Sequence, residues 1–272
     1  MSEESKAPAA LGRSIAELFN TVYDRFTNNP MLCDIWRRAM HDEYIDGSTN
    51  FSFVGTSDVR FVCNLIRESG GTRVLDLGCG NGHLSYLVAR DTNASVFLVD
   101  ISRVAVTQAR ERFGILADQH CFIVSDFDEL ALADRSVDFI FSFDSLQSSF
   151  DKSRCAIEVA RVMRDGGRLA FSFWCLKRPL GDLIKMEPLL KELHRHGFVA
   201  ESTLPIDPQL QKQKRIYSLI AANRKLLLVE VGSEFVGMMM REAIRIHTIS
   251  SGIQHCMIVM RKETETRIGP IR

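Results

Sequence analysis

The chain has no long apolar run and no excess of charge of either sign. Its 272 residues include 34 basic and 34 acidic side chains, so the formal net charge is zero. A chain without net charge has no electrostatic preference for nucleic acid or for an anionic membrane, and no apolar stretch reaches the length that spans a bilayer. We therefore expect neither nucleic acid nor a membrane as a partner, while self-association into a homo-oligomer stays open.

Cysteine pairs and metal-binding patterns are also missing. The seven cysteines are scattered, odd in number and never spaced C-x-x-C, which indicates free thiols in a reducing, cytoplasmic compartment. His194 and His196 form the one close histidine pair, but side chains two apart on a helix point to different sides, so we expect no metal site. The first residues carry charge without a long apolar stretch, which predicts a disordered tail over 1–13 and no signal peptide.

What the chain does contain is a glycine-rich turn directly after an apolar strand, over residues 74–82. Glycines at 78, 80 and 82 permit backbone conformations that side-chained residues disfavour, and they let a ligand touch the main chain. Asp76 lies at the end of the strand. The order D-x-G-x-G-x-G differs from the dinucleotide fingerprint G-x-G-x-x-G, because His83 stands where the third glycine of that fingerprint would fall.

A second apolar strand, residues 94–100, ends in Asp100, 18 residues after Gly82. A carboxylate at this distance from a glycine-rich turn can accept hydrogen bonds from both hydroxyls of a ribose. Taken alone, such an aspartate could also form a turn or an N-cap, a role that Ser102 could share.

The glycine-rich turn and the strand ends that follow it resemble, in order, those of the class I S-adenosylmethionine-dependent methyltransferases. The resemblance covers about residues 55–205 and the last strand. It implies S-adenosyl-L-methionine as the cofactor, with Asp126 accepting from the adenine amino group beside Phe127. It also implies that the Ser142 carbonyl lies near the amino group of the cofactor. The cofactor-binding residues expected on this basis are Asp76, Gly78, Gly80, Asn81, Asp100, Ile101, Asp126, Phe127 and Ser142.

Strands and helices alternate through this region, which favours a mostly parallel sheet. Predicted helices over 83–90 and 156–163 alternate with strands over 121–124, 137–142 and 168–174, and Asp165–Gly167 is expected to end the second helix. We predict an α/β, Rossmann-like fold with a seven-stranded, mostly parallel sheet, helices on both faces and an antiparallel last strand. The expected parts are a tail (1–13), an amino-terminal helical cap (14–54), a methyltransferase domain (55–261) with a helical lid insertion (205–250), and a mobile tail (262–272).

Two segments lie outside the common core of that family. Apolar stripes over 15–26 and 32–40 predict two amphipathic helices ahead of the usual first helix, which is expected to begin near Thr56 or Ser57. These extra helices resemble the cap of small-molecule methyltransferases of bacterial specialised metabolism. The lid insertion is expected to form two helices, over 209–223 and 233–247, that roof the active site. Its consecutive methionines, 238–240, suit an adaptable pocket, a core or an oligomer contact.

The chemistry implied by the resemblance needs an in-line nucleophile and exclusion of water, and a general base only if the nucleophile must lose a proton. Candidates for such a base are Glu43 and Tyr44 in the loop after the second stripe, and His247 in the lid. A structural role for each stays open, and so does a polar contact from Asp144.

Residues 143–146 lack the paired prolines of methyltransferases that act on nucleic-acid bases, and Gln147 stands where many small-molecule members have a histidine. The expected activity is therefore methyl transfer to O, N or C of a small, largely apolar metabolite. The alternatives are a cyclase or isomerase that retains its cofactor, and a non-catalytic binding module.

Overall fold

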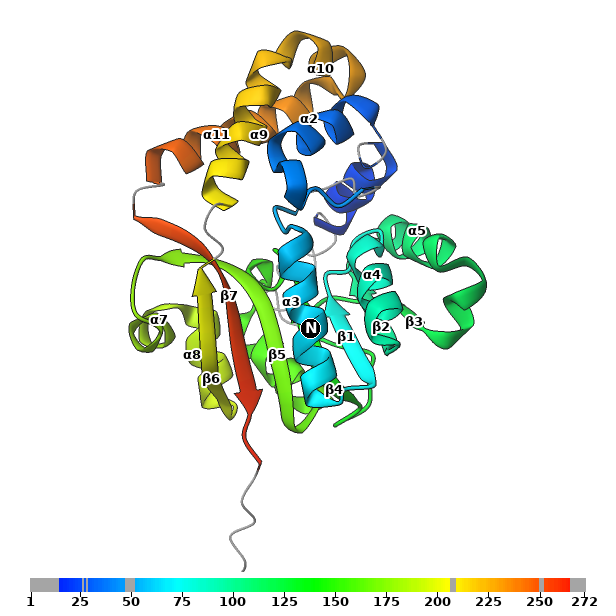
Figure 1. Cartoon of the computed structure of the whole chain (residues 1–272), viewed down its shortest axis with the longest axis vertical. Coiled ribbons are helices and arrows are strands. Elements are labelled where there is room, and N and C mark those ends of the chain that lie inside the picture. The colour runs from blue at the N-terminus through cyan, green and yellow to red at the C-terminus, as the bar shows by residue number, and fades with distance from the viewer. Residues whose placement is uncertain are drawn as a thin grey trace, which may run out of the picture.

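A seven-stranded sheet forms the centre of the computed structural model (Figure 1), which describes residues 15–25, 27, 29–46, 52–205, 209–249 and 252–264. The strand order is β3-β2-β1-β4-β5-β7-β6, and β7 runs antiparallel to both of its neighbours. The predicted fold is confirmed. The strands are β1 (Arg73–Leu77), β2 (Ser95–Asp100), β3 (Cys121–Val124), β4 (Val137–Ser142), β5 (Met163–Leu176), β6 (Phe198–Pro205) and β7 (Ile253–Lys262).

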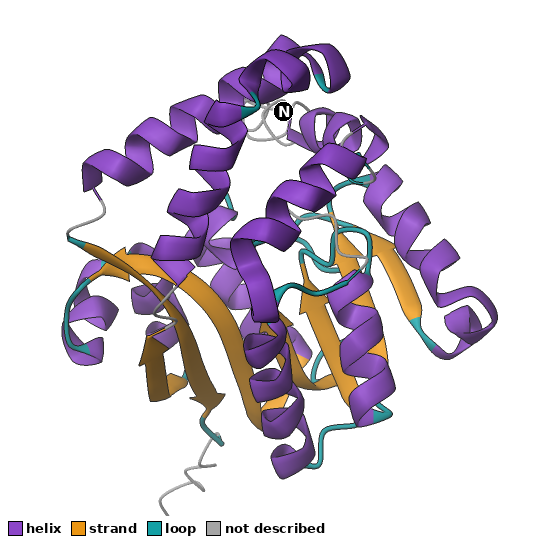
Figure 2. Cartoon of the chain, turned by 45° about the horizontal axis from the view of Figure 1, so that its top comes forward, coloured by secondary structure: helices purple, strands orange, loops and turns teal. Residues whose placement is uncertain are grey.

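Helices pack on both faces of the sheet (Figure 2). Successive side chains of a strand point to opposite faces, so a strand covered on both sides is apolar at nearly every position. In β1, Leu75 and Leu77 join the core on one face and Val74 joins the core on the other. The first core is closed by α6 (Lys152–Val162), α7 (Leu180–Met186) and α8 (Pro188–Arg195), and the second by α3 (Thr56–Ser69), α4 (His83–Thr92) and α5 (Arg103–Phe113).

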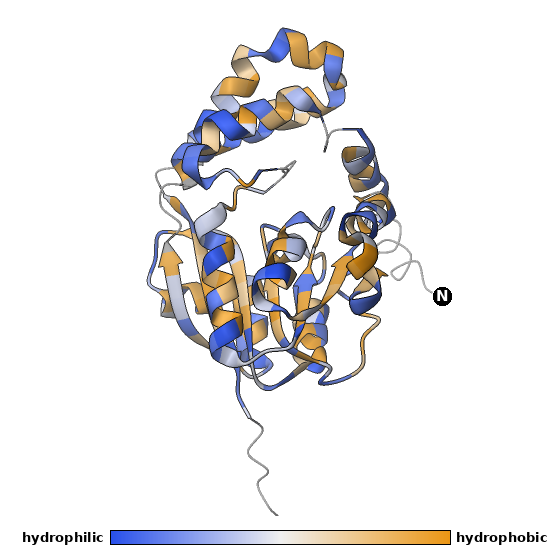
Figure 3. Cartoon of the chain, turned by 45° about the vertical axis from the view of Figure 1, so that its right-hand side comes forward, coloured by the Kyte–Doolittle hydropathy of each residue, from blue (hydrophilic) through white to orange (hydrophobic). Residues whose placement is uncertain are grey.

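A third apolar core lies above the carboxyl ends of the strands. It joins α2 (Pro30–Met40) and the helical residues 15–25 to the helices inserted before β7, through side chains such as Trp36, Ile216 and Met239. We call these helices together the helical cover. Figure 3 shows the alternation of hydrophobic and hydrophilic residues along them. The inserted helices are α9 (Gln209–Ala222), α10 (Arg224–Glu230) and α11 (Gly232–Ile249).

The insertion therefore holds three helices where two were predicted. The separate helix is α10, which ends at Glu230, two residues before Gly232, a residue with φ of +84°. A left-handed residue cannot continue a right-handed helix, and glycine adopts it at little cost. Before β6, Pro188 begins α8 and separates it from α7.

The turn predicted at Asp165–Gly167 is also wrong, because these residues belong to β5. Gly166 has φ of +77°, and the register between β4 and β5 shifts at this level, as expected of a bulge. The helix before it, α6, begins at Lys152 instead of 156, because Asp151 accepts hydrogen bonds from the amides of Ser153 and Arg154.

Several predictions fall on residues outside the described ranges, namely the tail over 1–13, Phe26 of the first stripe, 47–51 of the following loop and most of the terminal tail. Lys262, the first residue of that predicted tail, is the last residue of β7, and its ammonium donates to the carbonyls of Ala160 and Met163. In the part of the chain that the structure describes, no helix is both long and apolar enough to cross a bilayer.

Candidate active site

A cavity of about 540 Å³ lies between the carboxyl ends of the strands and the helical cover. This edge of an open α/β sheet is where ligands bind in doubly wound folds. The floor of the cavity is polar and comes from the glycine-rich turn and the ends of β2 and β3. The roof is mostly apolar and comes from the cover. The floor includes Asp76, Gly78, Gly80, Asn81, Asp100, Ile101, Asp126 and Phe127, and the roof includes Leu18, Val22, Trp36, Phe53, Tyr217, Met238 and Met239.

Asp100 ties the second strand to the glycine-rich turn. Its Oδ2 accepts from the amide of Gly80 at 2.8 Å, and its Oδ1 accepts from the amide of Ser102 at 2.8 Å. The amide of Ile101 also donates to this carboxylate, and since a carboxylate has about four acceptor sites, capacity remains for a further donor. Asp100 is buried but lines the cavity, and a diol that enters there can meet both oxygens.

Gly78 and Gly80 shape a cradle that any side chain would fill. Both have positive φ, +84° and +54°. A Cβ built at Gly78 would lie 2.3 Å from Cβ of Ser145, and a Cβ at Gly80 would lie 2.5 Å from the hydroxyl of Tyr23. Gly82 serves packing instead, since a Cβ there would lie 2.6 Å from Cβ of Ala109 in α5.

The carboxylates of the floor suit a positively charged ligand. Burial raises the pKa of Asp76 to about 7, although Ser85 donates to its Oδ2 at 2.5 Å. Burial likewise raises the pKa of Asp100, and burial together with Asp100 raises that of the Tyr23 hydroxyl. A cation placed among these groups would stabilise their ionised forms.

Ser142 differs from the other predicted cofactor residues, because it is fully buried and does not line the cavity. Its hydroxyl donates to the carbonyl of Leu77 at 2.7 Å and accepts from the amide of Leu146 at 3.0 Å. The side chain therefore fixes the turn after β4 against the end of β1.

The three predicted base candidates do not line the cavity. Glu43 accepts from the amide and hydroxyl of Ser57 at 2.8 and 2.9 Å, at the start of α3. Burial raises its pKa, but these hydrogen bonds outweigh burial and leave the pKa lowered. Tyr44 has the guanidinium of Arg37 above its ring, at 5.3 Å from the centroid. His247 is exposed on α11, with Nδ1 2.8 Å from the carbonyl of Ala243.

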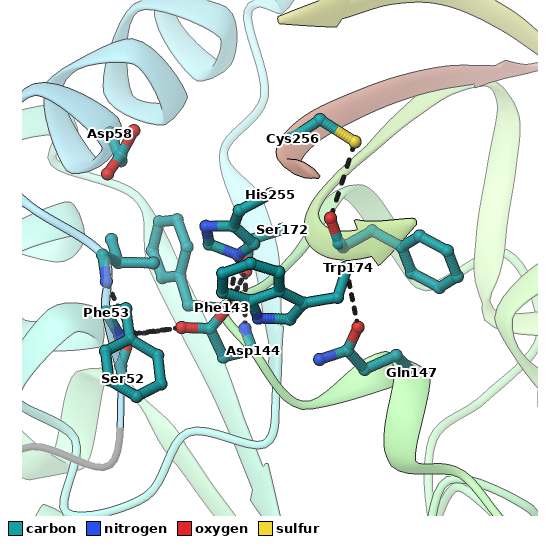
Figure 4. Close-up of polar contacts among 12 residues, drawn as sticks. Ser52, Phe53, Asp58, Phe143, Asp144, Gln147, Ser172, Trp174, His255 and Cys256 are labelled. Atoms are coloured by element: carbon teal, nitrogen blue, oxygen red, sulfur yellow. Dashed lines mark hydrogen bonds and ion pairs between the residues drawn. The ribbon is translucent and has the colours of Figure 1, made fainter. Parts of the chain in front are cut away.

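A buried polar cluster instead surrounds Asp144, the residue second after β4 (Figure 4). Its Oδ1 accepts from Nε2 of His255 and from Oγ of Ser172, each at 2.7 Å. Its Oδ2 accepts from Oγ of Ser52 at 3.0 Å and from the amide of Phe53 at 2.9 Å. Burial alone would raise the pKa of Asp144, but His255 and these hydrogen bonds lower it to about 2. The group is an ionised carboxylate with all of its acceptor sites filled.

Sequence reasoning missed His255, Tyr23 and Tyr217 as residues of the site. His255 is paired in β7 with Trp174 of β5, whose ring stacks on the imidazole with 4.4 Å between centroids. Tyr23 follows Val22 on the first stripe, and no motif marks it. The ring of Phe53 lies 6.5 Å from that of Trp36 and 6.2 Å from that of Tyr217, and these contacts join segments far apart in the sequence.

Comparison with known families agrees with this site. A family model described as a methyltransferase domain matches residues 68–224, more than half of the chain. The chain belongs to the class I S-adenosylmethionine-dependent methyltransferase family. The match spans the glycine-rich turn and the strand ends that form the floor of the cavity.

Relatives of the chain include proteins that are named as methyltransferases. It is 30% identical over 163 residues to the 27-O-demethylrifamycin SV methyltransferase of Amycolatopsis mediterranei, covering 58% of this chain and 59% of that one. It is 37% identical over 117 residues to the methyltransferase GfsG of Streptomyces halstedii, covering 42% of each. The matches thus span about half the length of these relatives.

Among solved structures, the [4+2]-cyclase SpnF superposes with a TM-score of 0.70 at 20% identity, covering 93% of this chain and 97% of that one. At this identity the likeness shows the fold, and it extends to the helical cover as well as the sheet.

S-adenosylmethionine is the cofactor of this methyltransferase family, and the floor of the cavity fits it. Gly78 and Gly80 line the cavity with main chain alone, since a Cβ there would overlap Ser145 or Tyr23. Asp100 offers two oxygens to a diol, and the acidic floor suits a ligand with a positively charged sulfur.

Proposed function

We propose that this protein transfers a methyl group from S-adenosylmethionine to a small, largely apolar molecule. The observation that carries the proposal is one cavity with two unlike halves, an acidic floor at the glycine-rich turn and an apolar roof made by the helical cover. A cavity of this size encloses small molecules, and its apolar walls favour ligands with apolar surface. The relatives named for methyl transfer in natural-product pathways, such as that acting on 27-O-demethylrifamycin SV, support the same reading.

The residues of the floor would hold the cofactor. Asp100 would accept from the ribose hydroxyls, and Asp126 from the adenine amino group, beside Phe127 and Ile101. Gly78, Gly80 and Asn81 would lie against the methionine part, near Asp76. Ser142 would contribute through its carbonyl, since its hydroxyl already has partners within the fold.

S-adenosylmethionine, when bound, supplies a methyl group on a positively charged sulfur, which is already activated for displacement by a nucleophile. The chain then has to bind the acceptor, orient it and exclude water. We propose that the amino-terminal cap and the lid insertion serve this purpose together, because they share one apolar core over the cavity.

Proton removal, where an acceptor requires it, would fall to groups in the part of the cavity under the helical cover, where the acceptor would bind. We call this part the acceptor side. Glu43, Tyr44 and His247 have their contacts elsewhere. Asp144 has its acceptor sites filled, and burial raises the pKa of Tyr217, which keeps it a neutral hydroxyl. Glu242 is the remaining carboxylate on that side.

The cellular setting is a proposal as well. All seven cysteines are free thiols, and Sγ of Cys175 lies 3.3 Å from Sγ of Cys256 in the interior of the sheet. Thiols this close stay reduced in a reducing compartment, and we place the protein in the cytoplasm, acting on a small molecule rather than on nucleic acid.

The proposed activity can be tested with S-adenosylmethionine that carries a trideuterated methyl group. The protein is incubated with a panel of apolar phenols, alcohols and amines, and mass spectrometry follows both the demethylated cofactor and the acceptors. Methyl transfer predicts stoichiometric demethylated cofactor and an acceptor in which one trideuterated methyl group replaces one hydrogen. An Asp100→Ala variant should lose both signals together with cofactor affinity.

The same experiment separates the alternatives. A cyclase or isomerase that retains its cofactor would convert a substrate without a change of mass and without consuming the cofactor. A binding module would take up the cofactor and convert nothing. Absence of cofactor binding by the unaltered protein would overturn the proposal.

A further inference from the structure

Among the described residues, the ionisable side chains that line the cavity are carboxylates, together with one imidazole, one thiol and two phenols. Its lining includes the carboxylates of Asp76, Asp100, Asp126, Asp144 and Glu242. Among the described residues that line it there is no lysine or arginine. The imidazole of His83 does not supply a positive charge either, because burial and the neighbouring Arg112 lower its pKa to about 4.

On the acceptor side, Glu242 is the charged group with room for a partner. It lies on α11, one helical turn after Met238, so both side chains fall on the same face of the helix, and both line the cavity. Among the described residues it pairs with Arg245, whose Nε lies 3.9 Å from Oε1, and the side chains of Glu242 and Arg245 are 38% and 66% exposed. An ion pair this long and this exposed holds its partners weakly.

Asp144, the other carboxylate on this side, cannot take that role. Its four hydrogen bonds come from Ser52, Phe53, Ser172 and His255 and occupy both oxygens. It adds negative potential to the cavity but no free acceptor site.

We infer that this cavity selects its acceptor by charge, admitting neutral or cationic apolar molecules and rejecting carboxylates and phosphates, with Glu242 as the specificity-determining residue. The inference rests on the proposed function, since it names the class of acceptor for the same site. An anion that enters the cavity loses its hydration and finds no cation to replace it, and it also meets the carboxylate of Glu242. A neutral acceptor has no such cost, and an amine gains the attraction of Glu242.

Binding of three matched probes tests the inference without requiring turnover. The probes are 2-naphthol, 2-(aminomethyl)naphthalene and 2-naphthoate, which share one ring system and differ in charge at neutral pH. Calorimetric titrations are made with and without the demethylated cofactor, so that failure of cofactor binding, which would count against the proposed function, is seen separately. We expect the amine and the naphthol to bind at least about 100-fold more tightly than the naphthoate.

Charge reversal at one position then tests the role of Glu242. Glu242→Lys should weaken binding of the amine about tenfold and strengthen binding of the naphthoate. The affinities of Glu242→Gln should lie between those of the unaltered protein and Glu242→Lys. Glu234→Lys is the matched control, because Glu234 lies on the same helix, is exposed and does not line the cavity. This control changes the net charge of the protein by the same amount and should leave the order of affinity for the three probes unaltered. Thermal melts show whether each variant is folded.

The inference is overturned if the naphthoate binds within threefold of the naphthol, or if none of the three probes binds. The role of Glu242 is overturned if the folded Glu242→Lys and Glu242→Gln variants keep the same order and ratios of affinity as Glu234→Lys.

Discussion

Nε2 of His255 lies 2.7 Å from Oδ1 of Asp144, although 111 positions separate the two residues. The contact joins β7 to the turn after β4, and the second carboxylate oxygen of Asp144 holds Ser52 and Phe53. Because Phe53 packs on Trp36 and Tyr217 of the helical cover, one buried carboxylate connects the sheet to the wall of the cavity. The imidazole nitrogen beside a carboxylate must carry the proton, since the carboxylate can only accept.

Replacement of Asp144 by asparagine should destabilise the fold strongly. An amide has one oxygen and its nitrogen donates, so at least one of the four donors around the carboxylate loses its acceptor inside the protein. We expect a loss of about 2 to 4 kcal/mol in the free energy of unfolding, measured by urea titration. Asp118→Asn, at an exposed position in the 3-10 segment Gly114–Gln119, is the control. Equal stability of the two variants would contradict the importance given to the cluster.

Acid should remove the contribution of Asp144. The folded pKa of Asp144 is about 2, below the usual value of 3.8 for an aspartate. A lowered pKa gives stability that is fully present above the unfolded value and is lost as the pH falls through the folded value, so the window lies between about pH 4 and pH 2. The expected contribution is about 2 kcal/mol. Urea titrations across that window should show a smaller decline for Asp144→Asn than for the unaltered protein, and equal declines would refute the assignment.

In the cofactor-free protein, ionisation of Asp76 should lower the stability of the fold, whereas ionisation of Asp144 raises it. Burial raises the folded pKa of Asp76 from 3.8 to about 7. The fold is therefore most stable with respect to this group below about pH 4, where Asp76 is protonated, and loses that stability as the pH rises towards 7. Asp76→Asn removes this penalty and keeps an oxygen for the hydroxyl of Ser85. We expect the variant to be more stable at pH 8, by up to about 4 kcal/mol, with a flatter pH dependence in thermal melts. A variant less stable at pH 8 would show that the carboxylate has a stabilising partner there.

The floor of the cavity could be predicted from the sequence because its signals are local. Asp76 and Asp100 each end a strand, and the carboxyl ends of parallel strands meet at one edge of the sheet. The structure has all three carboxylates, those of Asp76, Asp100 and Asp126, in the lining of one cavity.

The roof and the cluster at Asp144 could not be predicted in this way. An amphipathic stripe shows which face of a helix is buried, but not which other helix covers it, so the contact between Trp36 and the inserted helices has no sequence signal. His255 lies in a strand with apolar residues after it, and only the antiparallel pairing of β7 with β5 brings it to Asp144. Glu43 and His247 were plausible bases by residue type, yet their side chains bond to Ser57 and to the backbone of α11.

The cradle at Gly80 gives the sharpest test of the cofactor site, because the chain contains a matched glycine elsewhere. Gly80 and Gly114 have nearly equal φ, +54° and +53°. An alanine at either position would have to take a positive φ, which residues with a side chain rarely adopt. At Gly114 a Cβ would meet nothing within 4 Å, whereas at Gly80 it would lie 2.5 Å from the hydroxyl of Tyr23.

Gly80→Ala should therefore weaken binding of the demethylated cofactor at least about tenfold in calorimetric titrations, an effect of about 1.4 kcal/mol or more. Gly114→Ala should lose stability from its positive φ and leave the affinity unchanged. Adding Tyr23→Phe to Gly80→Ala removes the oxygen nearest to the new methyl group and should restore part of the affinity. If both alanine variants bind the cofactor equally well, the turn at Gly80 does not contact it, and the floor residues would have to be assigned another role.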